Sequence, residues 1–219
     1  MKKQSNFIAY IFLFLTVTFW AGNFVVGKFA SLYEVPPFSL NFYRWFFAWL
    51  ILAPFTLPEI IKKKDYIINN YKLFIVLGVT SITIFNSIVY YSLNFTQVIS
   101  GVLMISTIPV MIMFFSSIMK IEKTNLFQII GVIFSFVGVI IIITKANFEI
   151  LKNLNFNKGD ITMVVAMFSW ALYSTLLKKQ KYEISQLSLL QVVMSFGLAF
   201  LIPIYFIEYQ LGFRITLDK

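Results

Sequence analysis

The chain has 219 residues, of which 59% are hydrophobic and only 12% are charged. Soluble domains carry about 25% charged and about 45–50% apolar residues, so this composition excludes a soluble globular enzyme, and it is also unlike that of a disordered chain. The 18 Lys and Arg residues outnumber the 9 Asp and Glu residues and fall in short clusters between apolar runs. That pattern favours contact with anionic lipid head groups over nucleic acid, and it is typical of a polytopic membrane protein.

The chain contains no cysteine and no histidine. Disulfides, thiolate metal sites and the commonest general base are therefore excluded. We expect no catalytic residues, no cofactor and no metal, and hence no enzyme.

Charge-poor runs predict the transmembrane segments. A bilayer core about 30 Å thick takes roughly 20 apolar residues of helix. Seven helices are expected, over 4–27, 38–57, two within 73–119, 124–144, 161–177 and 184–207. The run 73–119 is too long for one crossing and should break near Asn94–Gln97. The predicted fold class is therefore an all-α polytopic membrane helix bundle.

Lysine and arginine predict the orientation of this bundle. With the N-terminus cytoplasmic, eleven of these residues lie in cytoplasmic segments and five lie outside. Because cytoplasmic loops carry the excess of positive charge, we expect a cytoplasmic N-terminus. The excess of Lys, Ile, Asn and Phe suggests a bacterial cytoplasmic membrane.

Self-comparison indicates an internal repeat. The matching pairs, at offsets of 149 or 150 residues, are Trp20-Ala21 with Trp170-Ala171, Lys28 with Lys178, Ser39-Leu40 with Ser188-Leu189, and Pro54 with Pro203. Five predicted helices separate the copies, and because five is odd the second copy should be inverted. Inverted repeats are typical of alternating-access carriers.

Several segments resemble the EamA-type carriers of the drug/metabolite transporter superfamily. They are Phe19–Lys28, Pro37-Phe38 with Arg44, Asn86–Gln97 running on to Pro109-Val110, Glu122 with Gln128, Gly131 and Gly138, and Lys158-Gly159-Asp160 with Trp170–Tyr173. The resemblance implies a ten-helix carrier of small organic metabolites such as amino acids, often in the export direction. It divides the chain into a first five-helix repeat over 1–147 and the first two helices of a second repeat over 158–219.

Three helices of that pattern are absent from the sequence. The chain is then a fragment, the product of a truncated gene, or a protein whose missing helices a second chain supplies. A non-functional fragment and a heptahelical membrane receptor remain the alternatives to a carrier. The receptor fits less well, because 184–207 contains no lysine for a retinal Schiff base and the expected orientation is reversed.

Arg44 lies about six residues inside the second predicted span. A buried arginine costs several kcal/mol unless it is paired or hydrated. It is a candidate to bind an anionic group of the solute or to form a gate. The alternative is an anchor that reaches outward to Glu34 or a carbonyl.

Other polar and aromatic side chains inside the spans are further candidates for lining a solute site. They are Trp20, Asn23, Asn86, Tyr90, Tyr91, Trp170 and Tyr173. Helix packing and interfacial aromatic belts are the structural alternatives for all of them.

Prolines, glycines and carboxylates predict helix kinks, helix packing and the mode of transport, respectively. Pro54, Pro109 and Pro203 are expected to act as hinges or fixed kinks, and Gly131 and Gly138 to permit close helix packing. All nine carboxylates fall near helix ends or in loops. Their placement favours facilitated diffusion or exchange over proton antiport.

Overall fold

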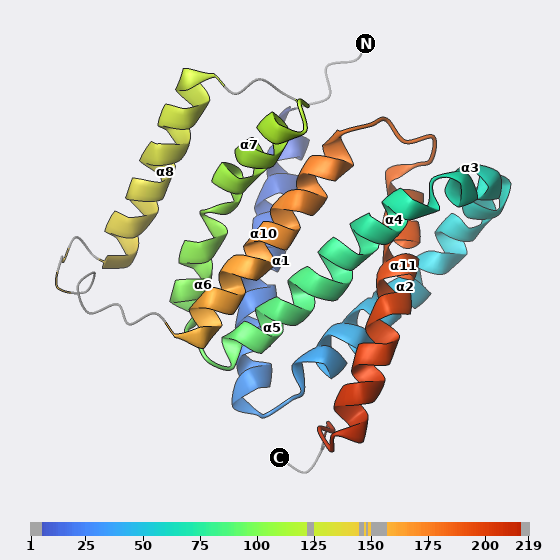
Figure 1. Ribbon diagram of the computed structural model, residues 1–219, viewed down its shortest axis with the longest axis horizontal. Helices are drawn as coiled ribbons and strands as arrows, with labels where there is room; N and C mark the ends of the chain where they lie inside the picture. The colour runs from blue at the N-terminus through green and yellow to red at the C-terminus, as the bar shows by residue number, and fades with distance from the viewer. Residues whose placement is uncertain (1–5, 122–124, 145–146, 148, 150–156, 216–219) are drawn as a thin grey trace.

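The computed structural model describes residues 6–121, 125–144, 147, 149 and 157–215, and these form an all-helical bundle (Figure 1). Its elements in chain order are α1 (Asn6–Leu32), α2 (Pro37–Lys62), α3 (Lys64–Asn69), α4 (Tyr71–Gly78), the π-helix η1 (Val79–Asn86), α5 (Ser87–Leu93), α6 (Val98–Ile105), α7 (Ile108–Ile118), α8 (Leu126–Thr144), α10 (Lys158–Lys178) and α11 (Gln186–Gln210). The prediction of a polytopic membrane helix bundle is confirmed, and the described residues include no strand.

Five helical segments among the described residues are long and apolar enough to cross a membrane. They are Phe7–Leu32, Pro37–Lys62, Tyr71–Leu93, Lys158–Lys178 and Gln186–Gln210. The fourth expected span is broken into α6 and α7, and α8 covers the fifth. The turn expected at Asn94–Gln97 lies between the end of α5 and the start of α6.

Helices α2 and α11 pack antiparallel, and a carboxylate closes each end of the pair. Glu208, near the end of α11, accepts from the backbone N–H of Ser39 (2.6 Å) and from its hydroxyl (2.7 Å) at the start of α2. At the opposite end, Glu59 accepts from the hydroxyls of Ser185 and Ser188, both at 2.5 Å. Each carboxylate thus satisfies free donors at a helix N-terminus, where negative charge is also favoured.

Helix α4 with η1 crosses α11 at a contact that needs glycine. A Cβ at Gly78 would lie 2.6 Å from the backbone nitrogen of Gly197, and a Cβ at Gly197 would lie 2.5 Å from the Cβ of Ile82. The Thr83 hydroxyl donates to the Gly197 carbonyl at 2.8 Å beside this crossing. Small residues at such positions let two backbones approach closely.

The N-terminus of α10 is anchored against the α5–α6 turn. Asn157 and Asp160 form a reciprocal capping box, which satisfies the first N–H groups of α10. The Thr96 hydroxyl also donates to the Asp160 carboxylate. The end of α1 reaches the same turn, since the Lys28 ammonium donates to the carbonyls of Leu93 (2.7 Å) and Thr96 (3.0 Å). Helices α1 and α10 are therefore also antiparallel.

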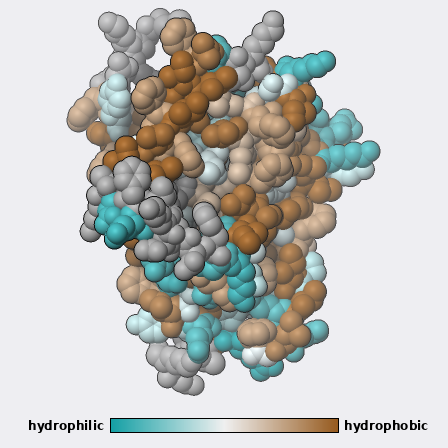
Figure 2. Space-filling model, turned by 60° about the vertical axis from the view of Figure 1, so that its left-hand side comes forward, coloured by the Kyte–Doolittle hydropathy of each residue, from teal (hydrophilic) through white to brown (hydrophobic). Residues whose placement is uncertain are grey.

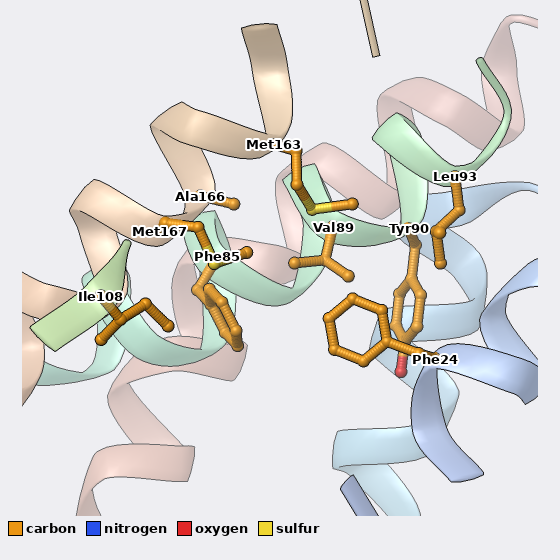
Figure 3. Close-up of a cluster of buried hydrophobic side chains, with 9 residues drawn as sticks. All are labelled: Phe24, Phe85, Val89, Tyr90, Leu93, Ile108, Met163, Ala166 and Met167. Carbon is orange, nitrogen blue, oxygen red and sulfur yellow. The ribbon is translucent and has the colours of Figure 1, made fainter. Parts of the chain in front are cut away.

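A buried apolar cluster joins these elements (Figure 3). It comprises Phe24 of α1, Phe85 of η1, Val89, Tyr90 and Leu93 of α5, Ile108 of α7, and Met163, Ala166 and Met167 of α10. A second cluster lies between α4, α11 and η1 around Phe74, Leu77 and Val193. Together the two clusters hold α4, η1 and α5 at the centre of the bundle.

The outer surface is largely apolar, as a lipid-facing surface must be (Figure 2). Helix α1 is the most exposed of the long helices, because only 6% of its most apolar stretch is buried inside the bundle. Helix α8 lies at the edge of the bundle (Figure 1). A Cβ at its Gly131 or Gly138 would meet no described atom within 4 Å, so the close packing expected there is absent from the part of the chain that the structure describes.

Candidate functional site

A cavity of about 390 Å³ lies between α1, α2, η1, α6, α7, α10 and α11. Six residues that the sequence predicted line it: Trp20, Asn23, Arg44, Asn86, Trp170 and Tyr173. They come from four elements that are far apart along the chain. The bundle therefore brings most of the predicted site into one space.

Arg44 is the centre of a polar network beside this cavity. Its guanidinium donates to the side-chain oxygen of Asn23 from α1 and to that of Asn86 from η1, the latter at 2.6 Å. The Tyr90 hydroxyl of α5 donates to the same Asn23 oxygen at 2.6 Å. The guanidinium carbon also lies 4.8 Å from the ring centroid of Trp45 and 5.4 Å from that of Tyr90. The membrane-embedded charge is thus held by neutral oxygens and aromatic faces.

The π-helix η1 presents Asn86 to Arg44. In this wider helix, side chains donate to three consecutive backbone carbonyls. Ser169 donates to the carbonyl of Thr80 at 2.8 Å, Asn86 to that of Ser81 at 2.7 Å, and Asn41 to that of Ile82 at 2.9 Å. The Asn86 amide nitrogen is therefore fixed, which turns its oxygen towards Arg44. Such π segments are frequent at functional sites.

Aromatic rings form much of the cavity wall. The rings of Trp20 and Trp170 meet edge to face at 5.6 Å, and Trp170 lies 4.6 Å from Phe85 and 5.1 Å from Tyr173. Trp20 and Trp170 are the two tryptophans that the self-comparison of the sequence matched. These rings give the cavity wall a large apolar surface of fixed shape.

Two predicted residues do not line the cavity. Tyr90 is 3% exposed and contacts the site through Asn23 and Arg44: its hydroxyl donates to the Asn23 oxygen, and its ring faces the guanidinium. Tyr91 lies elsewhere: it is 36% exposed, and its ring packs against Phe95 at 5.1 Å. Consecutive helical residues point about 100° apart, so both tyrosines could not face one cavity.

Sequence reasoning missed more than half of the lining. The missed residues are Phe19, Phe24, Trp45, Ala48, Ser81, Ile82, Phe85, Ile105, Ile108, Leu190 and Val193. Most are apolar residues with no distinguishing signal in an apolar helix. Trp45 and Ala48 could have been found, because they adjoin Arg44 or lie one turn from it.

The electrostatics of the site are one-sided. Among the lining residues that the structure describes, Arg44 is the single charged side chain. No cluster of three metal-ligating side chains occurs within the described ranges. The described lining therefore carries a single positive charge, and the described residues supply no metal centre.

These features define a class: a polytopic membrane protein whose helices line a largely apolar cavity that contains one charged side chain. The sequence matches the EamA-like transporter family over residues 7–144, more than half of its length. The chain belongs to this family of transporters.

The chain is also similar to three curated transporters, all described as uncharacterized. It is 27% identical over 201 residues to one from Archaeoglobus fulgidus, covering 90% of this chain and 67% of that protein. It is 27% identical over 195 residues to YyaM of Bacillus subtilis, covering 89% and 64%, and 24% identical over 179 residues to YrdR, covering 80% and 55%. The chain thus spans between about half and two thirds of the length of these relatives. No solved structure matches it significantly.

Proposed function

We propose that the chain is a secondary carrier of small organic metabolites such as amino acids, and that the Arg44 cavity is its solute site. The observation that carries this proposal is the cavity itself, which joins one charged group to aromatic walls at the centre of a transporter-family bundle. Its volume of about 390 Å³ lies within the range of about 300–1,000 Å³ for small-molecule sites. A facilitator or an exporter fits this site.

We further propose that the carrier works by alternating access between two inverted repeats, one over 1–147 and the other beginning at 158. The two carboxylate caps support this division. Ser39 bonds to Glu208 while Ser188 bonds to Glu59, and both the serines and the glutamates are related by the repeat offset of 149. An antiparallel pair with equivalent contacts at its two ends is what an inverted repeat produces.

The proposed location is the cytoplasmic membrane with a cytoplasmic N-terminus. The lysine-rich segments 62–64 and 178–181 lie at one end of the bundle, where Lys63 meets Glu183 at 3.5 Å. Helix α1 begins at this same end, opposite the α5–α6 turn (Figure 1). Positive charge concentrates on the cytoplasmic side of membrane proteins.

The lipid bilayer and a solute are the proposed partners of the chain. Further helices, from a second chain or from a longer form of this one, would cover the exposed side of the cavity. The 219-residue chain is an active carrier if it transports without these helices and a non-functional fragment if it does not. The counterflow experiment described next distinguishes the two.

Counterflow in proteoliposomes tests the proposed function. Vesicles containing the purified 219-residue chain are preloaded with unlabelled L-phenylalanine or 3-phenylpropanoate, and uptake of the labelled solute is followed. A carrier gives saturable uptake that the preloaded solute accelerates. Uptake that rises linearly with concentration and equals that of protein-free vesicles contradicts the proposal for this chain.

A further inference from the structure

We propose that the cavity selects carboxylate-bearing solutes with an apolar body and rejects cationic solutes of the same shape. This inference rests on the proposed function, since it names the substrate class of the Arg44 site. Three features of the described residues carry it: an uncompensated positive charge, oxygen acceptors that are already occupied, and an aromatic wall.

The charge of Arg44 has no carboxylate partner in the described network. Its two hydrogen bonds go to the neutral oxygens of Asn23 and Asn86. The cavity lining described by the structure contains no aspartate or glutamate. An anion that enters therefore meets a net positive site, whereas a cation meets a like charge in a poorly screened environment.

The hydrogen-bonding groups of the site also favour an anion, because donors remain free while acceptors are occupied. A guanidinium has five N–H donors in a planar fork that suits a carboxylate, and the two amide oxygens take only part of this capacity. The Asn23 oxygen already accepts from both Arg44 and Tyr90. The Ser81 carbonyl already accepts from the Asn86 nitrogen. A bound carboxylate finds unused donors, but a bound ammonium finds few acceptors.

The aromatic wall raises the competing expectation that a cation is held by cation–π contacts. Arg44 itself already lies over the rings of Trp45 and Tyr90. A second cation in the same space would add repulsion from Arg44 to the loss of its own hydration. The wall of Trp20, Phe85 and Trp170 is therefore assigned to the apolar body of the solute.

Three probes with one aromatic body separate these charge states. They are 3-phenylpropanoate, which carries only the carboxylate, L-phenylalanine, which carries both charges, and phenethylamine, which carries only the ammonium. Three of the four tryptophans of the chain line the cavity, namely Trp20, Trp45 and Trp170. Binding to the purified 219-residue chain in nanodiscs is followed by tryptophan fluorescence.

The expected result is that 3-phenylpropanoate binds at least as tightly as L-phenylalanine and roughly 10- to 100-fold more tightly than phenethylamine, the ratio that charge-assisted hydrogen bonds provide. Asn23→Asp places a carboxylate against Arg44 with almost no change of shape, and it should reduce this ratio to about one or below. Asn69→Asp changes the net charge equally at the exposed end of α3 and should leave the ratio unchanged.

The outcomes distinguish this inference from the proposed function. If phenethylamine binds as tightly as 3-phenylpropanoate, or if Asn23→Asp leaves the preference intact, charge selection is refuted while the cavity remains a solute site. If none of the three probes changes the fluorescence, the inference and the proposed site are both refuted.

Discussion

Among single residues, Arg44 carries a charge that the bundle must accommodate inside a transmembrane helix. A charge in a transmembrane helix is stable only when polar groups replace its water. Here Asn23 from α1 and Asn86 from η1 accept from the guanidinium, and Tyr90 from α5 donates to the same Asn23 oxygen. The same network that stabilises the charge also fixes the guanidinium beside the cavity.

Tyr90→Phe tests this network with a small change. The phenyl ring keeps the packing against Leu93 and Phe24, but the bond to Asn23 is lost. We expect the free energy of unfolding to fall by about 0.5–1.5 kcal/mol, the net value of one hydrogen bond, and solute affinity to fall several-fold as Asn23 loosens.

Thermal unfolding in detergent and probe binding by tryptophan fluorescence measure the two effects of Tyr90→Phe. The matched control is Tyr91→Phe, because the Tyr91 side chain lies outside the cavity. Equal effects of the two variants would refute the role assigned to Tyr90.

The sequence predicts the polar half of the site better than the apolar half. Arg44, Asn23 and Asn86 stand out because polar groups inside apolar spans need partners. It could not decide between the adjacent Tyr90 and Tyr91, since that choice depends on the rotation of α5 about its axis. Nor could it single out Phe85 or Ile108 among many similar residues.

At the scale of elements, the π-helix η1 is the feature that sequence reasoning missed. The run 79–86 is less apolar than α4, since it contains Thr80, Ser81, Thr83 and Asn86, but it carries no local signal for π winding. Its stability comes from Ser169 of α10, Asn41 of α2 and its own Asn86, which bond to its carbonyls. Such partners are known only once the tertiary arrangement is known.

The sequence predicts the positions of the long helices better than the points where helices are interrupted. Run lengths of apolar residues placed the long helices, and the polar Asn94–Gln97 marked the turn after α5. The break between α6 and α7, at residues 106–107, lies just before Pro109, one of the three prolines expected to act as hinges or kinks. Pro54 and Pro203 instead lie within the unbroken helices α2 and α11.

Gly78→Ala tests the crossing of α4 and α11. The added methyl group would meet the backbone of Gly197 and Val193, so the helices must separate. We expect a loss of stability of about 1–3 kcal/mol, as for overpacked cores. The measurement is thermal unfolding in detergent. Gly22→Ala is the control, since a Cβ at Gly22 meets no described atom within 4 Å; a Gly78→Ala protein as stable as this control would argue against the close crossing.

Glu208→Gln tests the buried cap of α2. The carboxylate is 5% exposed and accepts three hydrogen bonds from Phe38 and Ser39. An amide retains one acceptor but no charge, so the free energy of unfolding should fall by about 1.5–3 kcal/mol. Unfolding in detergent is compared with that of Glu183→Gln, which removes only an exposed pair with Lys63 and should cost at most about 1 kcal/mol. If Glu208→Gln and Glu183→Gln lower the free energy of unfolding equally, the Glu208 cap does not stabilise the fold.

At the scale of the whole molecule, the antiparallel pairs α1 with α10 and α2 with α11 surround one central cavity. Trp20 and Trp170, which the self-comparison of the sequence matched, touch ring to ring between α1 and α10. Glu59 and Glu208 are also 149 residues apart, but their contacts with Ser188 and Ser39 are visible only in the structure.

The most direct test of the account is two-sided access to the cavity. The native chain contains no cysteine, so Ala48→Cys introduces a single thiol into the cavity wall. In sealed vesicles of either orientation, a membrane-impermeant maleimide should label this thiol from both sides, and excess 3-phenylpropanoate should slow the labelling. Lys64→Cys, at an exposed position between α2 and α4, should be labelled from one side only. If Ala48→Cys is also labelled from one side only, with or without solute, the cavity does not alternate between the two sides of the membrane.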